Sequence, residues 1–328
     1  MDRFPDRNEL RILFSHAAYQ MAYCFSLRNN QVSHSQAWST EDTQALLPTA
    51  DVLVVSGFWQ NEYLDHANRL RYIQSIGAGY DQFPLDTLKT RGISLANATG
   101  VNADAVSQHA MGLILALYRQ LHIGRDNQQQ KIWRGMISDI TMREDDLCGH
   151  TVLIVGLGAI GNRLAALSKA FGMTVVGVKR NIDDYSGPAD EVVAPECFPD
   201  QLARADVVVL CCPLTDQTHG LMNDRAFCAM KQSAYLVNVA RGGCVNEPAL
   251  LSALNHDSIA GAAIDHFNDE PLPVSSPFWA LDNLIITPHR AGSSQHRPQK
   301  TFEFFCDNLR RYLKGEKLEN VVNKNLGF

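Results

Sequence analysis

The chain has 328 residues, of which 45% are hydrophobic and 20% are charged. This composition is typical of a globular protein, and the length is enough for two domains with separate cores. A formal net charge of −6 argues against nucleic acid or an acidic membrane as a partner, and no apolar run approaches membrane-spanning length.

The eight cysteines are scattered and include no C-x-x-C pair. We therefore expect a reduced, cytoplasmic protein without a metal site. The stretch 1–11 is charged and lacks an apolar segment, so no secretory signal is expected.

The first part of the chain alternates between strand-like and helix-like segments. Short apolar runs predict strands at residues 11–15, 51–56, 71–76 and 93–97, and helical spacing predicts helices at residues 17–28 and 85–90. Such alternation is typical of a parallel sheet covered by helices. Residues 1–101 are therefore predicted to form a small α/β domain.

A glycine-rich turn follows the third of these strands and reads Gly77-Ala78-Gly79-Tyr80-Asp81. Successive backbone N–H groups in such a turn can bind an anion. A plain turn is the competing interpretation of the same residues.

The longest helical pattern spans residues 101–121, with Asn102 or Asp104 as its N-cap. We interpret it as the crossover into a second domain. Residues 127–131 are polar and lead to Trp133, and we expect this segment to form an exposed arm.

The most informative motif lies at residues 151–180, which read as strand, glycine turn, helix and strand. The turn is Gly156-Leu157-Gly158-Ala159-Ile160-Gly161. Its first glycine permits a tight turn, the second lets the backbone approach a pyrophosphate, and the third lets the helix pack closely. The helix N-terminus adds free N–H groups for the phosphates. The motif predicts a dinucleotide-binding unit, and a glycine turn in an ordinary α/β core is the competing interpretation.

The end of the second strand of this unit bears on the choice of cofactor. An NAD site usually has an acidic residue about 20 residues after the glycines. This chain instead has Lys179 and Arg180, which suit a 2′-phosphate. We therefore favour NADP(H), and NAD(H) stays possible if these cations pair with Asp183 or Asp184.

Further strands are predicted at residues 206–210, 234–238, 261–264 and 284–286. Six strands counted from Thr151 would fill a doubly wound sheet, which assigns residues 102–292 to an NAD(P)-binding domain. The segment 293–313 has an amphipathic helical pattern. We expect it to return to the first domain, so that residues 293–328 belong there.

Polar residues follow consecutive strands of this predicted sheet, namely Arg241, Asp265 with Glu270, and His289. Ligands of such sheets bind at the carboxyl ends of the strands, so these side chains should converge. Arginine can bind a carboxylate and a carbonyl oxygen, histidine can transfer a proton near neutral pH, and a glutamate can orient the imidazole. Together they suit reduction of a 2-oxo acid, although each alone is more often structural.

Over nearly its whole length the chain resembles the D-isomer-specific 2-hydroxyacid dehydrogenase family. The resemblance is carried by residues 77–81, the glycine motif, Cys212-Pro213-Leu214-Thr215 with Thr218, Asn238-Val239-Ala240-Arg241-Gly242, residues 265–272, and Thr287-Pro288-His289 with Ala291-Gly292. It implies two Rossmann-like and flavodoxin-like parallel-sheet domains with the active site in the cleft between them.

The resemblance also implies roles for individual residues. Arg241 would bind substrate, Glu270 would pair with His289, and His289 would be the acid–base residue. Asp265 would hold the nicotinamide carboxamide. Other substrate contacts would come from Ala78, Gly79 and Tyr80, and other cofactor contacts from Gly156, Gly158, Ala159, Ile160, Gly161, Cys212, Pro213, Thr218, Ala240 and Gly292. A homodimer joined through the nucleotide domains is implied, in which Trp133 could reach the neighbouring active site.

The chain departs from the family pattern at Arg290, at Ser107-Gln108-His109 and at His266, so the identity of the substrate stays open. We expect an NADPH-dependent reductase of small 2-oxo acids such as glyoxylate or hydroxypyruvate. Phosphoglycerate dehydrogenation is less expected because the chain ends at Phe328, and formate oxidation finds no support before His289. An NAD(H)-dependent dehydrogenase of another substrate and a dinucleotide-sensing binding protein are the remaining hypotheses.

Overall fold

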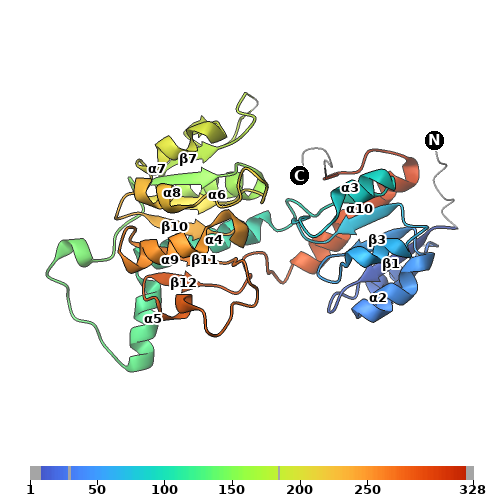
Figure 1. Cartoon of the computed structure of the whole chain (residues 1–328), viewed down its shortest axis with the longest axis horizontal. Coiled ribbons are helices and arrows are strands. Elements are labelled where there is room, and N and C mark those ends of the chain that lie inside the picture. Colours follow the sequence, from blue (N-terminus) through green and yellow to red (C-terminus); the bar gives the residue numbers. More distant parts are fainter. Residues whose placement is uncertain (1–8, 29–30, 184, 323–328) are drawn as a thin grey trace. The chain divides into compact units, whose positions relative to one another are not determined.

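The computed structural model describes residues 9–28, 31–183 and 185–322, so Asp184 lies outside the described residues, as do residues 1–8 of the stretch in which no secretory signal was expected. The chain divides into two compact units (Figure 1). One contains the chain up to Asn102 together with the segment from Ser294 on, and the other is Ala103–Ser293.

The first unit is built on a five-stranded parallel sheet with the order β2-β1-β3-β4-β5, which is the flavodoxin-like order. Its strands are β1 (Arg11–Ser15), β2 (Ser33–Ala37), β3 (Val52–Val55), β4 (Tyr72–Ser75) and β5 (Ser94–Ala96). β2 was not predicted from the sequence, because its polar residues pair only with β1 at the edge of the sheet.

Helices cover both faces of this sheet. α1 (Met21–Ser26) and α10 (Arg297–Lys314) pack on one face, and α2 (Thr40–Leu46) and α3 (Leu85–Thr90) lie on the other. The ring of Phe305 in α10 lies 5.3 Å from that of Phe14 in β1, centroid to centroid. α10 therefore packs on the sheet of the first unit.

The second unit has a seven-stranded parallel sheet with the order β12-β11-β10-β9-β6-β7-β8. Counted from β6, this is the doubly wound order of dinucleotide-binding proteins with one added strand. The strands are β6 (Thr151–Val155), β7 (Thr174–Val178), β8 (Glu191–Val193), β9 (Val207–Leu210), β10 (Tyr235–Asn238), β11 (Gly261–Ile264) and β12 (Leu284–Ile286). The predicted count of six was wrong because the short edge strand β8 was missed.

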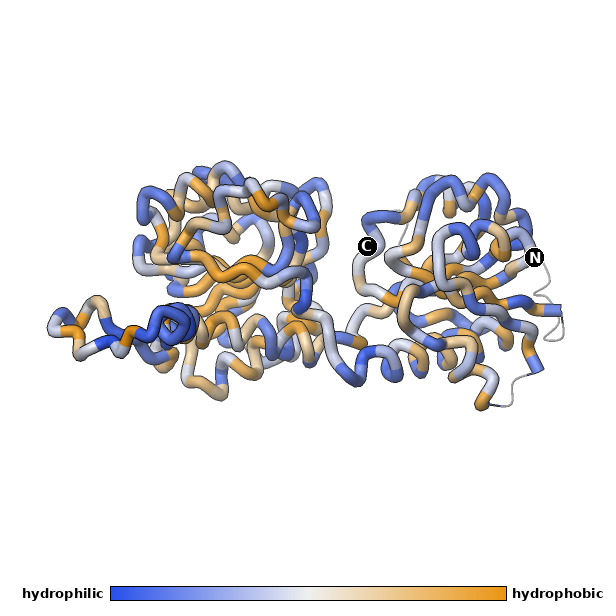
Figure 2. The backbone as a smooth tube through the Cα atoms, turned by 90° about the horizontal axis from the view of Figure 1, so that it is seen from below, coloured by the Kyte–Doolittle hydropathy of each residue, from blue (hydrophilic) through white to orange (hydrophobic). Residues whose placement is uncertain are grey.

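Two layers of helices enclose this sheet. α4 (Ala103–Tyr118) and α6 (Ala159–Ala170) pack on one face, and α7 (Phe198–Leu202), α8 (Asp224–Ala229) and α9 (Glu247–Asn255) on the other. Figure 2 shows the apolar strands inside and the polar residues outside.

No helix of the described ranges has the length and apolar character needed to cross a membrane.

The predicted single helix over 101–121 is two helices in the structure. α4 ends at Tyr118, Gln120 adopts a left-handed backbone with φ +49°, and α5 (Leu121–Gln130) begins immediately afterwards. α5 and the segment after it project from the rest of the second unit (Figure 1). Trp133 in this arm is 98% exposed.

Candidate active site

The glycine motif forms the turn between β6 and α6, at the point where the strand order reverses. Gly156 has φ +103°, and a Cβ there would lie 2.9 Å from backbone atoms of Cys212. A Cβ on Gly161 would lie 2.1 Å from the Gly156 carbonyl oxygen. Both positions therefore require glycine, as expected from the sequence for a tight turn and a close helix.

The space in front of this turn fits a phosphate-bearing cofactor. Gly158 is the N-cap of α6 and provides no side-chain cap, so the helix N-terminus keeps backbone donors for a ligand. A Cβ at Gly158 would meet nothing within 4 Å. The adjoining loop is closed by Thr218, whose hydroxyl donates to the Pro213 carbonyl oxygen at 2.7 Å. A dinucleotide can thus approach the backbone here.

Lys179 and Arg180 follow β7 directly, as expected. Lys179 is half-buried and Arg180 is exposed. Lys179 forms no ion pair with any residue that the structure describes, Asp183 included. The hypothesis that a neighbouring aspartate neutralises Lys179 therefore has no support from Asp183.

Asp265 organises the loops at the ends of β11 and β12. Its carboxylate is fully buried and accepts hydrogen bonds from the Thr287 hydroxyl at 2.5 Å and from the amides of Arg290 at 2.8 Å and Ala291 at 3.0 Å. Burial acts to raise the pKa of Asp265, but these hydrogen bonds outweigh it and hold that pKa below its ordinary value. Both carboxylate oxygens of Asp265 therefore already accept hydrogen bonds from the protein. The expected contact of Asp265 with the nicotinamide carboxamide stays a prediction.

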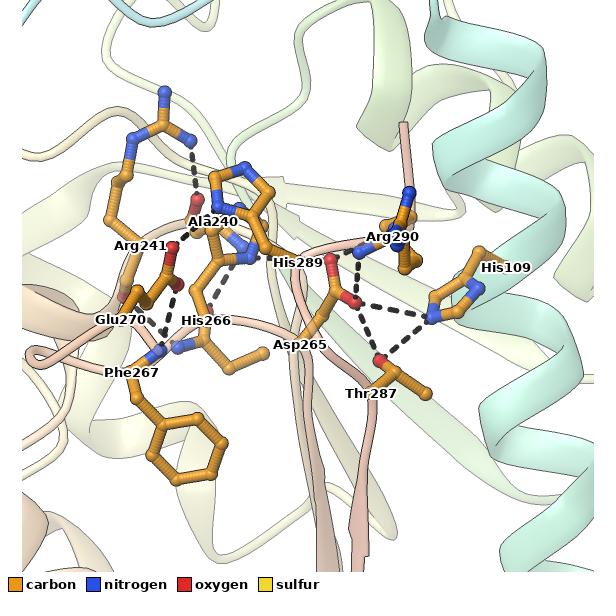
Figure 3. Close-up of polar contacts among 12 residues, drawn as sticks. His109, Ala240, Arg241, Asp265, His266, Phe267, Glu270, Thr287, His289 and Arg290 are labelled. Atoms are coloured by element: carbon orange, nitrogen blue, oxygen red, sulfur yellow. Dashed lines mark hydrogen bonds and ion pairs between the residues drawn. The ribbon is translucent and has the colours of Figure 1, made fainter. Parts of the chain in front are cut away.

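His289 and Glu270 form the expected pair. The Nδ1 atom of His289 lies 2.7 Å from Oε2 of Glu270, while Oε1 of Glu270 accepts from the Phe267 amide at 3.2 Å (Figure 3). The two side chains are 53% and 36% exposed. Because a carboxylate on Nδ1 fixes that nitrogen as the donor, Nε2 is left to exchange a proton with a ligand.

His289 has a left-handed backbone, with φ +52°. Its amide donates to the carbonyl oxygens of Asp265 at 2.9 Å and Thr287 at 3.0 Å. These bonds, together with those from the next two amides to the Asp265 carboxylate, hold a conformation that non-glycine residues rarely adopt. Asp265 therefore shapes the loop that presents the imidazole.

Arg241 follows β10 and is held by its neighbours. Its backbone carbonyl accepts from the Asn238 side chain at 2.9 Å, and its Nη1 donates to the Ala240 carbonyl oxygen at 2.7 Å. The next residue, Gly242, lies against the backbone of Phe267, where a Cβ would be 2.2 Å from the carbonyl carbon. This crossing brings the loop of Arg241 to the loop of Glu270, and Figure 3 draws Arg241, Glu270 and His289 together.

Three residues around this group, His109, His266 and Thr287, had no role predicted from the sequence. His109 of α4 lies 3.1 Å from the Thr287 hydroxyl and 3.6 Å from the Asp265 carboxylate. His266 is buried beside His289, with ring centroids 3.9 Å apart. Thr287 belongs to a stretch that matches the family, and His109 and His266 lie at departures from the family pattern. The sequence thus marked these positions, but the contacts they make are seen only in the folded chain.

The glycine turn after β4 belongs to the first unit. The carbonyl oxygen of Ala78 accepts from the Asn97 side chain at 2.9 Å, and Tyr80 is buried. Within the described part of the chain, the amides of Ala78 and Gly79 donate to no acceptor. Two adjacent donors of this kind suit a carboxylate.

No group of three or more His, Cys, Asp or Glu side chains in the described ranges is placed to bind a metal ion.

Comparisons with known proteins agree with this geometry. The family model "D-isomer specific 2-hydroxyacid dehydrogenase, NAD binding domain" matches residues 111–291. The glyoxylate/hydroxypyruvate reductase B of Pectobacterium carotovorum is 33% identical over 89% of this chain and 91% of its own length. The D-3-phosphoglycerate dehydrogenase of Methanocaldococcus jannaschii is 30% identical over 89% of this chain, which spans only 55% of that relative.

A solved structure shares the whole fold. The D-isomer specific 2-hydroxyacid dehydrogenase family protein of Aeromonas salmonicida superposes with a TM-score of 0.85. It is 31% identical in sequence, and the match covers 96% of this chain and 99% of that one. The expected fold of two parallel-sheet α/β units is thereby confirmed.

Proposed function

The chain belongs to the D-isomer-specific 2-hydroxyacid dehydrogenase family, and from that premise we propose that it is an NADPH-preferring reductase of small 2-oxo acids, such as glyoxylate or hydroxypyruvate. As a member of the family it is an NAD(P)-dependent oxidoreductase. The observation that carries the proposal is the 2.7 Å contact of Glu270 with His289, next to the loop of Arg241.

The proposed reaction assigns one task to each of these side chains. The guanidinium of Arg241 binds the substrate carboxylate and polarises the 2-oxo group. A nicotinamide cofactor, when bound, would supply the hydride that the carbonyl carbon accepts. His289 donates the Nε2 proton to the carbonyl oxygen, so that the C=O bond becomes the C–OH of a D-2-hydroxy acid, and Glu270 stabilises the protonated ring. The amides of Ala78 and Gly79 are proposed as further carboxylate donors.

The proposed NADPH preference depends on Lys179 and Arg180. Steady-state kinetics with NADPH and NADH, on a panel of 2-oxo acids, test it. We expect kcat/KM to favour NADPH at least tenfold, and the double change Lys179→Ser with Arg180→Ser to remove that ratio while sparing kcat with NADH. Equal or better use of NADH by the unaltered enzyme would remove the cofactor preference and leave the oxidoreductase assignment in place.

One alternative substrate has support from a relative. The M. jannaschii relative favours 3-phosphoglycerate as a second candidate substrate, and the same panel would include its 2-oxo form. A dinucleotide-sensing protein of this fold would bind NADPH tightly and turn over none of the acids. The complete Arg241, Glu270 and His289 set favours catalysis.

We also propose a cytoplasmic homodimer joined through the second unit. The arm after α5 carries apolar side chains that are largely exposed, among them Trp133, Met136 and Ile140. Exposed apolar groups gathered in one segment are typical of an interface. All eight cysteines are free, which suits a reducing compartment. Sedimentation of Trp133→Glu should show a shift toward monomer, and a wild-type protein that is itself monomeric would contradict the dimer.

A further inference from the structure

A second imidazole lies directly behind the one proposed to transfer the proton. His266 follows β11 and is only 6% exposed. Its ring centroid is 3.9 Å from that of His289, with the planes inclined at 52°. Figure 3 draws it between Asp265 on one side and the pair of Arg241 and Glu270 on the other. The reaction described above makes no use of this group.

The Nδ1 atom of His266 is buried and has no hydrogen-bond partner within the described residues. The nearest carboxylate oxygen, Oδ2 of Asp265, is 3.5 Å away. Leaving a buried polar atom unsatisfied costs roughly 1–3 kcal/mol of stability, and native proteins carry few of them. A polar ring at this buried position therefore calls for an explanation other than stability.

The surroundings keep this ring neutral. Burial lowers the pKa of His266 to about 3, and the positive charges of His289 and Arg241 act in the same direction. His109 adds to this effect, and the carboxylate of Asp265 opposes it. At any ordinary pH His266 therefore adds no positive charge beside His289.

The His289 ring needs support that its own loop does not supply. Its side chain is half exposed, and among the described residues its ring is hydrogen-bonded along a single edge, to Glu270. A single bond on one edge allows the ring to tilt about that bond. The neutral ring of His266 covers the inner side and limits this tilt without adding a second positive charge.

We propose that His266 is a positioning residue for His289, holding its ring so that Nδ1 stays on Glu270 and Nε2 keeps one direction. The expected effect of His266 on kcat rests on the proposed function, whereas its expected effect on the orientation of the His289 ring does not. Since displacement of a reacting group by 1 Å can reduce the rate about 10²-fold, a partial loss of support should be measurable.

The test uses the full chain with His266→Val and His266→Asn, which remove the ring, and His266→Phe, which restores a ring without nitrogens. We expect both ring-removing variants to lose at least tenfold in kcat with NADPH, with the KM for the 2-oxo acid and NADPH binding within threefold of wild type. His266→Phe should recover at least a third of wild-type kcat. Thermal unfolding and NADPH fluorescence establish which variants are folded.

A second measurement is independent of turnover. In ¹⁵N-histidine NMR spectra, the hydrogen-bonded Nδ1–H of His289 should be visible in wild type and in His266→Phe, and broadened or absent once the ring is removed. A folded ring-removed variant with kcat within twofold of wild type, or with the Nδ1–H signal unchanged, overturns the proposal. Wild type inactive on every 2-oxo acid would refute the proposed function alone, because the NMR comparison still tests the positioning.

Discussion

Gly242 offers the sharpest test of how the site is assembled, because it lies where two loops of the second unit cross. In Gly242→Ala, the new Cβ would lie 2.2 Å from the carbonyl carbon of Phe267, 2.4 Å from its oxygen and 2.5 Å from the amide nitrogen of Asn268. All three are backbone atoms, so none can rotate away. The loops that carry Arg241 and Glu270 must separate instead.

The required separation sets the size of the effect. Ordinary carbon contacts begin near 3.4 Å, so relief of the shortest contact moves the backbones apart by about 1.2 Å. A displacement of 1 Å at a reacting group can cost about 10²-fold in rate. We therefore expect kcat to fall about 10²-fold, with about 1–3 kcal/mol of destabilisation from the overpacking.

Steady-state kinetics with a 2-oxo acid and NADPH, next to urea unfolding, measure both effects. Gly112→Ala is the matched control, because a Cβ there meets nothing within 4 Å and the residue lies inside α4. That change should leave kcat unaltered and add roughly 0.5–1 kcal/mol of stability. A folded Gly242→Ala enzyme with kcat close to wild type would refute the idea that this crossing aligns the site.

Four further outcomes are expected. His289→Ala should lower kcat by roughly 10²–10⁴-fold with NADPH binding retained, as titrated by fluorescence. Gly161→Ala places a Cβ 2.1 Å from a backbone oxygen and should lower Tm, by about 2–4 °C per kcal/mol lost. Thr287→Val removes a hydrogen-bond donor to the Asp265 carboxylate. Because the folded pKa of Asp265 is lowered, its ionised form stabilises the fold at pH values above the ordinary pKa of an aspartate, and this stabilisation is lost as the pH falls through the folded pKa. The variant should be less stable at pH 7 and lose less on acidification, as urea unfolding will show. His266 has a pKa of about 3 in the folded protein and an ordinary pKa of 6.5. Between these values the unfolded chain binds a proton that the folded protein does not, so wild-type stability decreases as the pH is lowered from 6.5 to about 3. His266→Phe should flatten this fall, and identical unfolding profiles would contradict the neutral buried ring.

The buried parallel strands could be predicted well from the sequence. Runs such as the one in β6 are apolar throughout because helices cover both faces of the sheet, and the glycines next to it follow from backbone sterics alone. The strands β2 and β8 were missed for the opposite reason. Each is an edge strand paired on one side, with only partial burial. β2 has the largely polar sequence SHSQA, and β8 has only the three residues EVV, which are too few to show a pattern.

The candidate site divides in the same way. Arg241, Glu270 and His289 follow from the rule that ligands meet the carboxyl ends of parallel strands. The hydrogen bond between His109 and Thr287 joins residues 178 positions apart, and no local pattern could reveal it. The ring contact of His266 also arises only from folding, because it depends on how far β11 and β12 extend before their loops turn.

The division of the first unit between the two ends of the chain has a consequence for biosynthesis. Phe305 of α10 is fully buried and packs on Phe14 and Phe25, so this face of the first sheet has only α1 as cover until α10 has left the ribosome. The second unit is one continuous segment and can fold as soon as it emerges. The earliest strands to be translated are therefore among the last to be shielded, and a nascent chain stalled before α10 would depend on chaperones to keep them from aggregating.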